Sequence, residues 1–167
     1  PSVTTSVQHV GCAGESTGSA TATATGGVSD YTYAWVDLAS NNIGAGEFID
    51  NLSLGLYVIS VTDAVNCVAT RTVNIKEPLI IQFMNSSEDN ISCFGQSDGA
   101  VTANVFGGTL PYSLLWNNSQ TGYTATGLSS GVVSVSVSDV KGCSVASSVT
   151  LTEPTEMSVD TVAGGTT

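Results

Sequence analysis

Residues 131–148 read GVVSVSVSDVKGCSVASS, and this stretch determines the fold that the sequence predicts. Valine and serine alternate through residues 133–138, and a period of two is typical of a β-strand with one buried and one solvent-facing side. Residues 55–72 read GLYVISVTDAVNCVATRT and show a similar alternation, followed by an Asp and a Cys at the same spacing. The pattern therefore predicts a core strand and a turn, and its recurrence indicates an internal repeat.

A longer alignment supports the repeat. When Cys12 is placed on Cys93, the two copies align without a gap as far as their tryptophans. The matched pairs are Gly14/Gly95, Ser16/Ser97, Gly18/Gly99, Gly26/Gly107, Gly27/Gly108, Tyr31/Tyr112 and Trp35/Trp116. Both copies end in Glu-Pro. We therefore predict a first repeat over residues 1–78, a second over residues 79–154 and the start of a truncated third over residues 155–167.

The fold class follows from the strand pattern within each copy. Several short segments alternate apolar and polar residues, and glycine-rich turns separate them at intervals of roughly 8–12 residues, as in β-sandwiches. The abundant β-branched residues favour strands over helices. The sequence therefore predicts an all-β chain of two tandem Ig-like or PKD-like β-sandwich repeats. Four matched aromatic side chains are expected in their cores, namely Tyr31, Trp35, Tyr112 and Trp116.

Composition excludes several classes of partner. Charged residues make up 10% of the chain, the net charge is −11, and Lys and Arg together number three. Such a chain lacks the basic surface that binds nucleic-acid phosphates or anionic lipid headgroups. It also has no apolar run long enough to insert into a membrane, which takes about 18 residues. Its hydrophobic content of 41% is enough for a buried core and disfavours a disordered acidic tail.

The four cysteines fall two per repeat and allow three pairings. The repeat favours one disulfide inside each copy, Cys12–Cys67 and Cys93–Cys143. Disulfides form in oxidising compartments, so this pairing predicts a location outside the cytoplasm. Free buried thiols remain the alternative. A zinc site is disfavoured because the cysteines are isolated, without the close CxxC spacing of structural zinc ligands.

No catalytic set of residues is visible, and we predict that the chain is not an enzyme. His9 is the only histidine; it lies in a predicted edge strand and has no counterpart in the second copy. We therefore expect an exposed structural histidine rather than the base of a Ser-His-Asp or Cys-His set. Asp63 and Asp139 recur at equivalent turns, where we expect each carboxylate to bond the backbone N–H groups of its turn.

Two kinds of binding site stay open. Glu77, Glu88 and Asp89 lie near the junction of the repeats and could hold Ca²⁺, although a solvated acidic surface explains them equally well. No other cofactor is predicted. Exposed aromatic side chains could form a sugar-binding platform. The candidates are the aromatic residues unmatched between the copies, namely Phe48, Phe94, Phe106 and Tyr123.

The ordered motifs of the two copies resemble a known family. They are C-x-G-x-x-x-G, then GG-x-x-x-Y-x-x-x-W, then L-x-x-G-x-Y/V-x-I/V-x-V-x-D-x-x-x-C, and finally V-x-I/L-x-EP. This series resembles the SprB repeat of very large surface proteins in gliding and other Bacteroidetes, and it covers nearly the whole chain twice. The first copy departs from the family at Asp30, where Pro111 fits, and at Asn66, where Gly142 fits.

The resemblance implies a structural repeat of a secreted, filamentous cell-surface adhesin. Such an adhesin is exported by the type 9 secretion system and, in gliding species, is carried by the motility machinery. Its expected partners are neighbouring repeats of the same chain and a surface polysaccharide or substratum. The apolar junction at residues 75–83 favours a stiff rod. The alternative is a non-catalytic carbohydrate-binding or spacer module of a secreted protein or hydrolase. Residues 160–162, DTV, match the O-glycosylation pattern of Bacteroidetes and make Thr161 a candidate acceptor.

Overall fold

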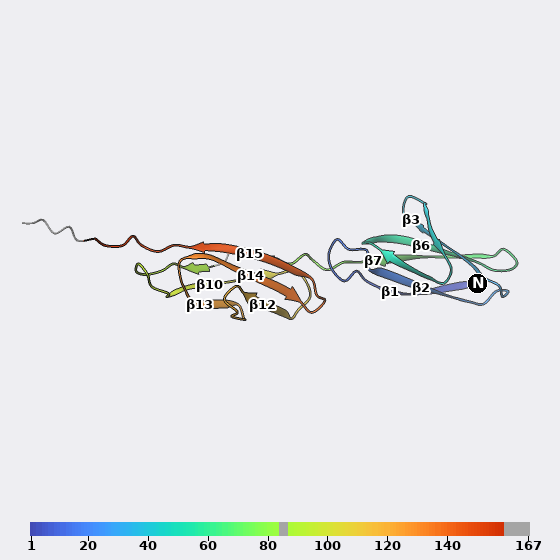
Figure 1. Ribbon diagram of the computed structural model, residues 1–167. Coiled ribbons are helices and arrows are strands. Elements are labelled where there is room, and N and C mark those ends of the chain that lie inside the picture. The colour runs from blue at the N-terminus through green and yellow to red at the C-terminus, as the bar shows by residue number, and fades with distance from the viewer. Residues whose placement is uncertain (84–86, 159–167) are drawn as a thin grey trace, which may run out of the picture. The chain divides into compact units, whose positions relative to one another are not determined.

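The computed structural model describes residues 1–83 and 87–158, and the described chain consists of strands, turns and loops (Figure 1). It divides into two compact units. Unit 1 holds Pro1–Ile81 together with two short segments of the second repeat, Gly107–Leu110 and Asp139–Cys143. Unit 2 holds the rest of the second repeat. Among the described residues, no helix is long and apolar enough to cross a membrane.

The first repeat forms seven strands. They are β1 (Ser2–Gln8), β2 (Gly18–Thr25), β3 (Thr32–Asp37), β4 (Asn42–Ala45), β5 (Phe48–Leu52), β6 (Gly55–Thr62) and β7 (Val68–Ile75). They pair antiparallel into one sheet of order β1-β2-β5 and another of order β4-β3-β6-β7. The core strand predicted from residues 55–72 is β6, which lies between β3 and β7.

The core of the first repeat lies between these two sheets. Ala20 and Ala22 of β2 and Ile59 and Val61 of β6 are buried, while the polar residues between them are more exposed. Trp35 of β3 is fully buried among them, and Tyr31 packs against the cluster from its edge. The two-residue period of the sequence therefore produces two sheets, each with one buried face.

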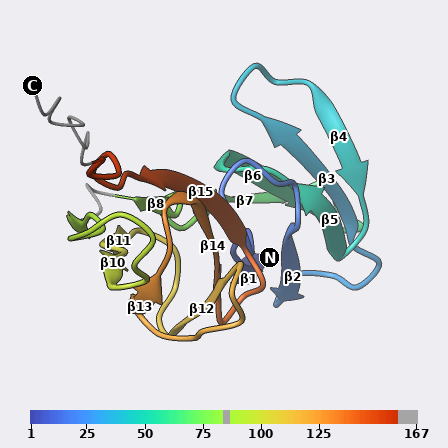
Figure 2. The same cartoon turned by 60° about the vertical axis from the view of Figure 1, so that its left-hand side comes forward.

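The second repeat repeats this arrangement with more interruptions. Its strands are β8 (Gln82–Phe83), β9 (Ser87–Asp89), β10 (Gly99–Thr102), β11 (Val105–Phe106), β12 (Tyr112–Trp116), β13 (Thr124–Leu128), β14 (Gly131–Asp139) and β15 (Ser144–Leu151). The opening stretch of sequence is the β14–β15 hairpin, in which Val133 is paired with Val149 and Val137 with Val145 (Figure 2). Trp116 is buried, and Tyr112 is half-buried.

One matched glycine is required by close packing in both repeats. A Cβ on Gly18 would lie 2.7 Å from both the Leu52 carbonyl oxygen and the Ile75 Cγ2 atom. A Cβ on Gly99 would lie 2.6 Å from the Cδ1 atom of Ile91 and 3.0 Å from the Leu128 carbonyl oxygen. These distances are too short for any side chain, so the repeated glycine allows β2 and β10, which it begins, to approach their neighbours closely.

Candidate functional site

The cysteines lie in two kinds of structure, at opposite ends of each repeat. We call residues 11–17 and 92–98 the cysteine loops; they contain Cys12 and Cys93. We call residues 63–67 and 139–143 the Asp–Cys turns; they contain Cys67 and Cys143 and join β6 to β7 and β14 to β15.

The first Asp–Cys turn is held by the carboxylate of Asp63. Its Oδ1 atom accepts hydrogen bonds from the N–H groups of Val65 at 3.0 Å and Cys67 at 2.9 Å. Its Oδ2 atom accepts a longer bond of 3.3 Å from the N–H of Val28, which directly follows the Gly26-Gly27 pair. We call this pair and the equivalent Gly107-Gly108 pair the glycine turns. Asp63 is buried, so each of these bonds replaces a bond to water that the carboxylate would otherwise make.

The second Asp–Cys turn has the same bonds. The Oδ1 atom of Asp139 accepts from the N–H groups of Lys141 at 2.8 Å and Cys143 at 3.0 Å, and its Oδ2 atom accepts from the N–H of Thr109 at 2.8 Å. The bracing that the sequence predicts for both aspartates is therefore present in both turns. The residue before the cysteine has a positive φ in each case, 63° at Asn66 and 87° at Gly142. Asn tolerates this left-handed conformation, so the departure of Asn66 from the family pattern leaves the turn unchanged.

These bonds shift the pKa of both carboxyls. The N–H of Cys67 is the main cause that lowers the pKa of Asp63; burial opposes it, and further N–H groups and the Pro1 ammonium, 4.0 Å away, add to the lowering. Burial is the largest single influence on Asp139 and raises its pKa, but four backbone N–H groups together outweigh it, so the net pKa is lowered. Both turns therefore favour the ionised carboxylate.

The cysteine loops are fastened to the other end of the last strand of each repeat. The N–H of Gly14 donates to the Oε2 atom of Glu77 at 2.7 Å, and the N–H of Gly95 donates to the Oε2 atom of Glu153 at 2.8 Å. Glu77 and Glu153 are the glutamates of the two Glu-Pro pairs, directly beyond β7 and β15. Their recurrence is therefore explained by a structural bond to the loop.

Further bonds shape both loops in the same way. The N–H of Gly11 donates to the hydroxyl of Thr17, and at the equivalent place the N–H of Ser92 donates to the carboxylate of Asp98. A hydrogen bond between two serine hydroxyls fastens each loop to a residue outside it. Ser16 bonds Ser53 at 2.7 Å, and Ser97 bonds Ser129 at 2.8 Å. The loop of Cys93 is thus built like the loop of Cys12.

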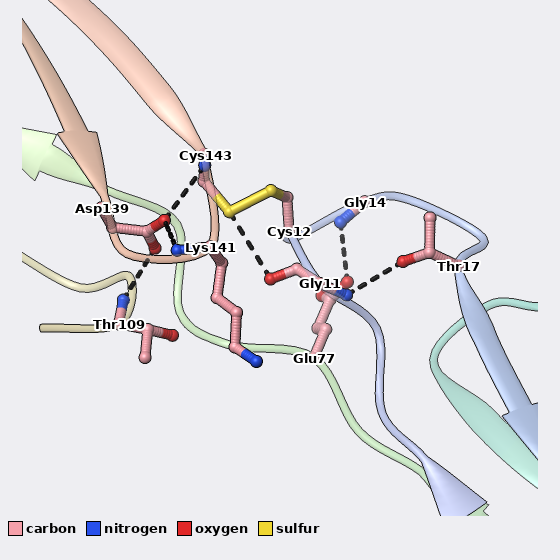
Figure 3. The surroundings of a disulfide bond; sticks show 9 residues. All are labelled: Gly11, Cys12, Gly14, Thr17, Glu77, Thr109, Asp139, Lys141 and Cys143. Atoms are coloured by element: carbon pink, nitrogen blue, oxygen red, sulfur yellow. Dashed lines mark hydrogen bonds between the residues drawn. A yellow bond between two sulfur atoms is a disulfide. The ribbon is translucent and has the colours of Figure 1, made fainter.

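A single disulfide connects one cysteine loop to one Asp–Cys turn. Cys12 is bonded to Cys143, with Cα atoms 5.5 Å apart and 131 positions of separation in the sequence (Figure 3). The sulfur of Cys143 also lies 3.5 Å from the carbonyl oxygen of Gly11. Cys67 and Cys93 are free and exposed. The bond joins the first repeat to the turn of the second repeat that belongs to unit 1.

The predicted disulfides Cys12–Cys67 and Cys93–Cys143 are therefore wrong. In the first repeat, Cys67 lies at the start of β7, whereas Glu77 holds the Cys12 loop near the end of β7. β7 has eight residues and spans roughly 25 Å at about 3.3 Å per residue, whereas disulfide-bonded Cα atoms lie within about 7 Å. The eight-residue β15 separates Cys93 from Cys143 in the same way.

A signal for this geometry is present in the sequence. In each copy the cysteine of the Asp–Cys turn stands just before the last strand and the Glu-Pro pair stands just after it, so a strand length separates them. What the sequence leaves undecided is the end of the sandwich at which the first cysteine of each copy lies. The Glu77–Gly14 and Glu153–Gly95 bonds supply that information.

His9 has a structural role at the end of β1. It is exposed, and its Nδ1 atom accepts a hydrogen bond of 3.2 Å from the N–H of Lys76, while the next residue, Val10, donates to the carbonyl oxygen of Lys76. These bonds continue the contact between the ends of β1 and β7. The imidazole therefore extends the backbone pairing of the first repeat.

The candidate calcium ligands belong to two different units. Glu77 bonds the Cys12 loop in unit 1, whereas Glu88 and Asp89 lie on β9 in unit 2 and are exposed. Over residues 1–83 and 87–158, no group of three or more His, Cys, Asp or Glu side chains could hold a metal ion. Calcium binding stays an untested prediction, and the candidate acceptor Thr161 lies outside the described residues.

The aromatic residues fall into two sets. Trp35 and Trp116 are buried, and their indole N–H groups donate to the carbonyl oxygens of Gly46 and Gly122 at 3.0 and 2.9 Å. The four candidates for a sugar-binding platform are exposed by between 38% and 55%, and these are Phe48, Phe94, Phe106 and Tyr123. Phe48 lies between two surface hollows of the first repeat, one along β5 and β6 and one along β1 and β2.

The fold is similar to that of known immunoglobulin-like structures. Three N-terminal domains of the highly immunogenic outer capsid protein (Hoc) of bacteriophage RB49 match with a TM-score of 0.55 and 19% identity, over 89% of this chain and 58% of that one. The chain thus spans little more than half of the Hoc fragment. IG1 and IG2 of DIP-gamma match with a TM-score of 0.45 and 12% identity, over 93% and 99% of the two chains. The predicted all-β, Ig-like sandwich class is confirmed.

One further solved structure matches at a lower TM-score than Hoc. The C-terminal fragment of intimin, solved with the intimin-binding domain of its translocated receptor, matches with a TM-score of 0.48 and 11% identity, over 90% of this chain and 64% of that one. No curated protein matches the sequence. At such identities the solved structures bear on the fold alone.

The family model of the SprB repeat matches the sequence twice, at residues 4–40 and 85–121. Each matched segment contains one cysteine loop, one glycine turn and one core tryptophan, at equivalent positions of the two copies. The predicted resemblance to the SprB repeat is therefore confirmed for two segments of the chain, residues 4–40 and 85–121.

Proposed function

We propose that the chain is a repeat segment of a large secreted, cell-surface adhesin, in which SprB repeats follow one another as a rod that holds the cell to a surface. The two SprB repeats are the observation that carries this proposal. The proposal assigns no reaction to the chain. The bonds of its recurring acids support this assignment, because Asp63, Asp139, Glu77 and Glu153 all accept structural bonds from backbone N–H groups.

An extracellular location is part of the proposal. A disulfide between Cys12 and Cys143 requires an oxidising compartment, and reducing thiols of the cytoplasm would keep such a pair open. Export by the type 9 secretion system and a role in gliding motility are its finer parts. They derive from the family resemblance of the sequence.

The charge and the surface chemistry suit a long extracellular array. The net charge of −11 makes neighbouring segments repel one another, which favours solubility over collapse. Many outward positions of the long strands carry Ser or Thr, for example Ser136 on β14 and Thr70 and Thr72 on β7, and all three are exposed. Such faces stay solvated without a large apolar patch.

An adhesion measurement tests the proposal. Beads coated with the chain are settled on glass and on polysaccharide-coated surfaces, and the fraction retained under flow is measured against beads coated with an acidic protein of another fold. We expect greater retention of the coated beads on at least one of the surfaces. Equal retention of both kinds of bead on every surface would remove the adhesive part of the proposal.

A carbohydrate-binding module is the second candidate. Phe48, 55% exposed beside two hollows, is the observation that favours it, because sugar rings stack on exposed aromatic faces. A glycan array probed with the chain and with Phe48→Ala distinguishes the two candidates. Tight binding that the substitution abolishes would favour the module. Tyr123→Ala, which removes a 49% exposed aromatic of the other repeat, is the matched control.

A further inference from the structure

We propose that Cys67 and Cys93 each form, with a cysteine of a further repeat, a disulfide of the same kind as Cys12–Cys143. In a longer array, Cys93 pairs with the Asp–Cys turn of the following repeat, and Cys67 pairs with the cysteine loop of the preceding repeat. Each disulfide then connects two successive repeats. The partner is therefore another repeat of the same kind, and the array is covalently linked from repeat to repeat.

The first support is that the Cys93 loop is already shaped like the bonded Cys12 loop. Both loops have an N–H to glutamate bond, at 2.7 Å from Gly14 and at 2.8 Å from Gly95. Both also have a backbone bond to the carbonyl oxygen of the cysteine, from Glu15 at 3.2 Å and from Gln96 at 3.1 Å. The loop of Cys93 therefore has the bonded conformation without a partner.

The second support is the matching state of the two Asp–Cys turns. Cys67 donates its N–H to Asp63 at 2.9 Å, and Cys143 donates its N–H to Asp139 at 3.0 Å. The carbonyl oxygens of both cysteines accept from the N–H of the same aspartates, at 3.0 and 2.9 Å. The turn of Cys67 therefore has the same backbone structure as the turn of Cys143, although only Cys143 is in a disulfide.

The third support is the exposure of the two free cysteines, which leaves them accessible to another repeat. Cys67 and Cys93 are exposed, whereas Cys12 and Cys143 are half-buried. Apolar side chains near the free cysteines in the sequence are exposed too: Val65 by 57% and Val68 by 60% near Cys67, and Phe94 by 51% next to Cys93. Closure within one repeat is excluded, since a whole strand separates its two cysteines. The partner of each free cysteine therefore lies in another repeat.

The bridge forms by oxidation of two thiols. Cys93 and the incoming turn cysteine each lose a proton and together lose two electrons as the S–S bond forms. A small-molecule disulfide such as oxidised glutathione accepts the electrons and is released as two thiols, through a mixed disulfide on one cysteine. Tethering in one chain raises the effective concentration of the two thiols into the millimolar range, which favours the bridge between successive repeats.

A duplicated chain tests the proposal. Residues 1–156 are fused to residues 1–167, so that three residues separate Glu153 from the second Pro1. This spacing reproduces that between Glu77 and Ile81, and Ile81 packs over Gly108 as Pro1 packs over Gly27. The fusion is folded with mixed reduced and oxidised glutathione, blocked with N-ethylmaleimide without reductant, and weighed by mass spectrometry.

The count of free thiols gives the result. The single chain has two free thiols, so a fusion without a new bridge has twice that number, four. We expect two, together with a peptide that joins Cys93 of the first copy to Cys67 of the second. The matched control replaces Cys93 of the first copy with Ser and is expected to show three. Four free thiols in the unsubstituted fusion, or a bridge between any other pair of these cysteines, would overturn the proposal.

The inference rests on the proposed array but not on its adhesive role. If the fusion forms the bridge and the coated beads fail to adhere, the linkage stands and the adhesive function fails. If the beads adhere and the fusion keeps four free thiols, the reverse holds. The two experiments therefore separate the two proposals.

Discussion

The two Asp–Cys turns are nearly identical in structure and differ in their covalent state. Residues 63–67 and 139–143 have the same carboxylate bonds and the same left-handed residue before the cysteine, yet Cys67 is free and Cys143 is bonded. The disulfide is therefore not needed to form the turn. The local sequence builds the turn whether or not its cysteine is bonded.

Comparing the two glycine turns explains why the Gly-Gly pair is also repeated, as Gly26-Gly27 and as Gly107-Gly108. A Cβ on Gly27 would lie 2.5 Å from the Oδ2 atom of Asp63, and a Cβ on Gly108 would lie 2.9 Å from the Oδ2 atom of Asp139. Both glycines also have positive φ angles, 77° and 58°. The glycine pair thus allows the buried carboxylate to reach the N–H of the residue after it.

The largest effect is expected from the core tryptophans, and it tests whether the two repeats are equally dependent on them. Trp35→Ala and Trp116→Ala each remove a buried ring and its indole bond, so each variant should lose about 3–5 kcal/mol of unfolding free energy. Urea unfolding measures the loss. Tyr123→Ala is the exposed control, and a loss of less than about 1 kcal/mol at Trp116 would contradict the structure.

The repeated glycine should give the next largest effect. Gly18→Ala and Gly99→Ala each force a Cβ to within 3.0 Å of a backbone oxygen, so each should cost about 1–3 kcal/mol. Gly55→Ala is the control, because its Cβ would meet only Tyr57, at 3.5 Å. Thermal unfolding of the three variants makes the comparison. A smaller loss at Gly18 than at Gly55 would show that the packing of β2 is looser than described.

The aspartates of the turns should produce a smaller, pH-dependent effect. Both carboxyls have a lowered pKa in the folded chain, so their contribution to stability is complete above the ordinary Asp pKa of about 3.9 and is lost as the pH falls through that value toward the folded pKa. Asp139→Asn should therefore lower the melting temperature by several degrees at pH 7, and the difference should shrink below pH 4.

Asp63→Asn sharpens that prediction. The Pro1 ammonium faces Asp63 at 4.0 Å, so part of its effect should disappear when the amino group is acetylated. Asp139 lies in the equivalent turn of the second repeat and serves as the reference. Scanning calorimetry between pH 2.5 and pH 7 measures both variants. Equal differences from the unsubstituted chain at every pH would contradict the lowered pKa values.

The smallest effect on stability is expected from blocking the free thiols. N-ethylmaleimide without reductant should modify Cys67 and Cys93, leave Cys12 and Cys143 unmodified, and leave the melting temperature nearly unchanged, because the free cysteines are exposed. Intact mass gives the number of adducts, and a peptide digest places them. Modification of Cys12 would show that its bond to Cys143 is open.

Much of each sandwich can be predicted from the sequence, because its information is local. The alternation in residues 133–138 gives strand β14 and its buried face, and the recurring Asp63 and Asp139 indicate the carboxylate bonds of their turns. Such features depend on neighbours a few positions away. The exposure of Phe48 is less predictable, because an unmatched aromatic could equally well be in the core.

By itself the sequence determined the repeat, the strands, the buried tryptophans and the chemistry of the turns, since each depends on local pattern and spacing. Only the tertiary structure decided the partner of each cysteine. The repeat favours pairs within a copy, but the Glu77–Gly14 bond holds Cys12 at the end of β7 opposite to Cys67. A disulfide needs its two Cα atoms within about 7 Å, and such a distance between residues 131 positions apart is set by the folded chain.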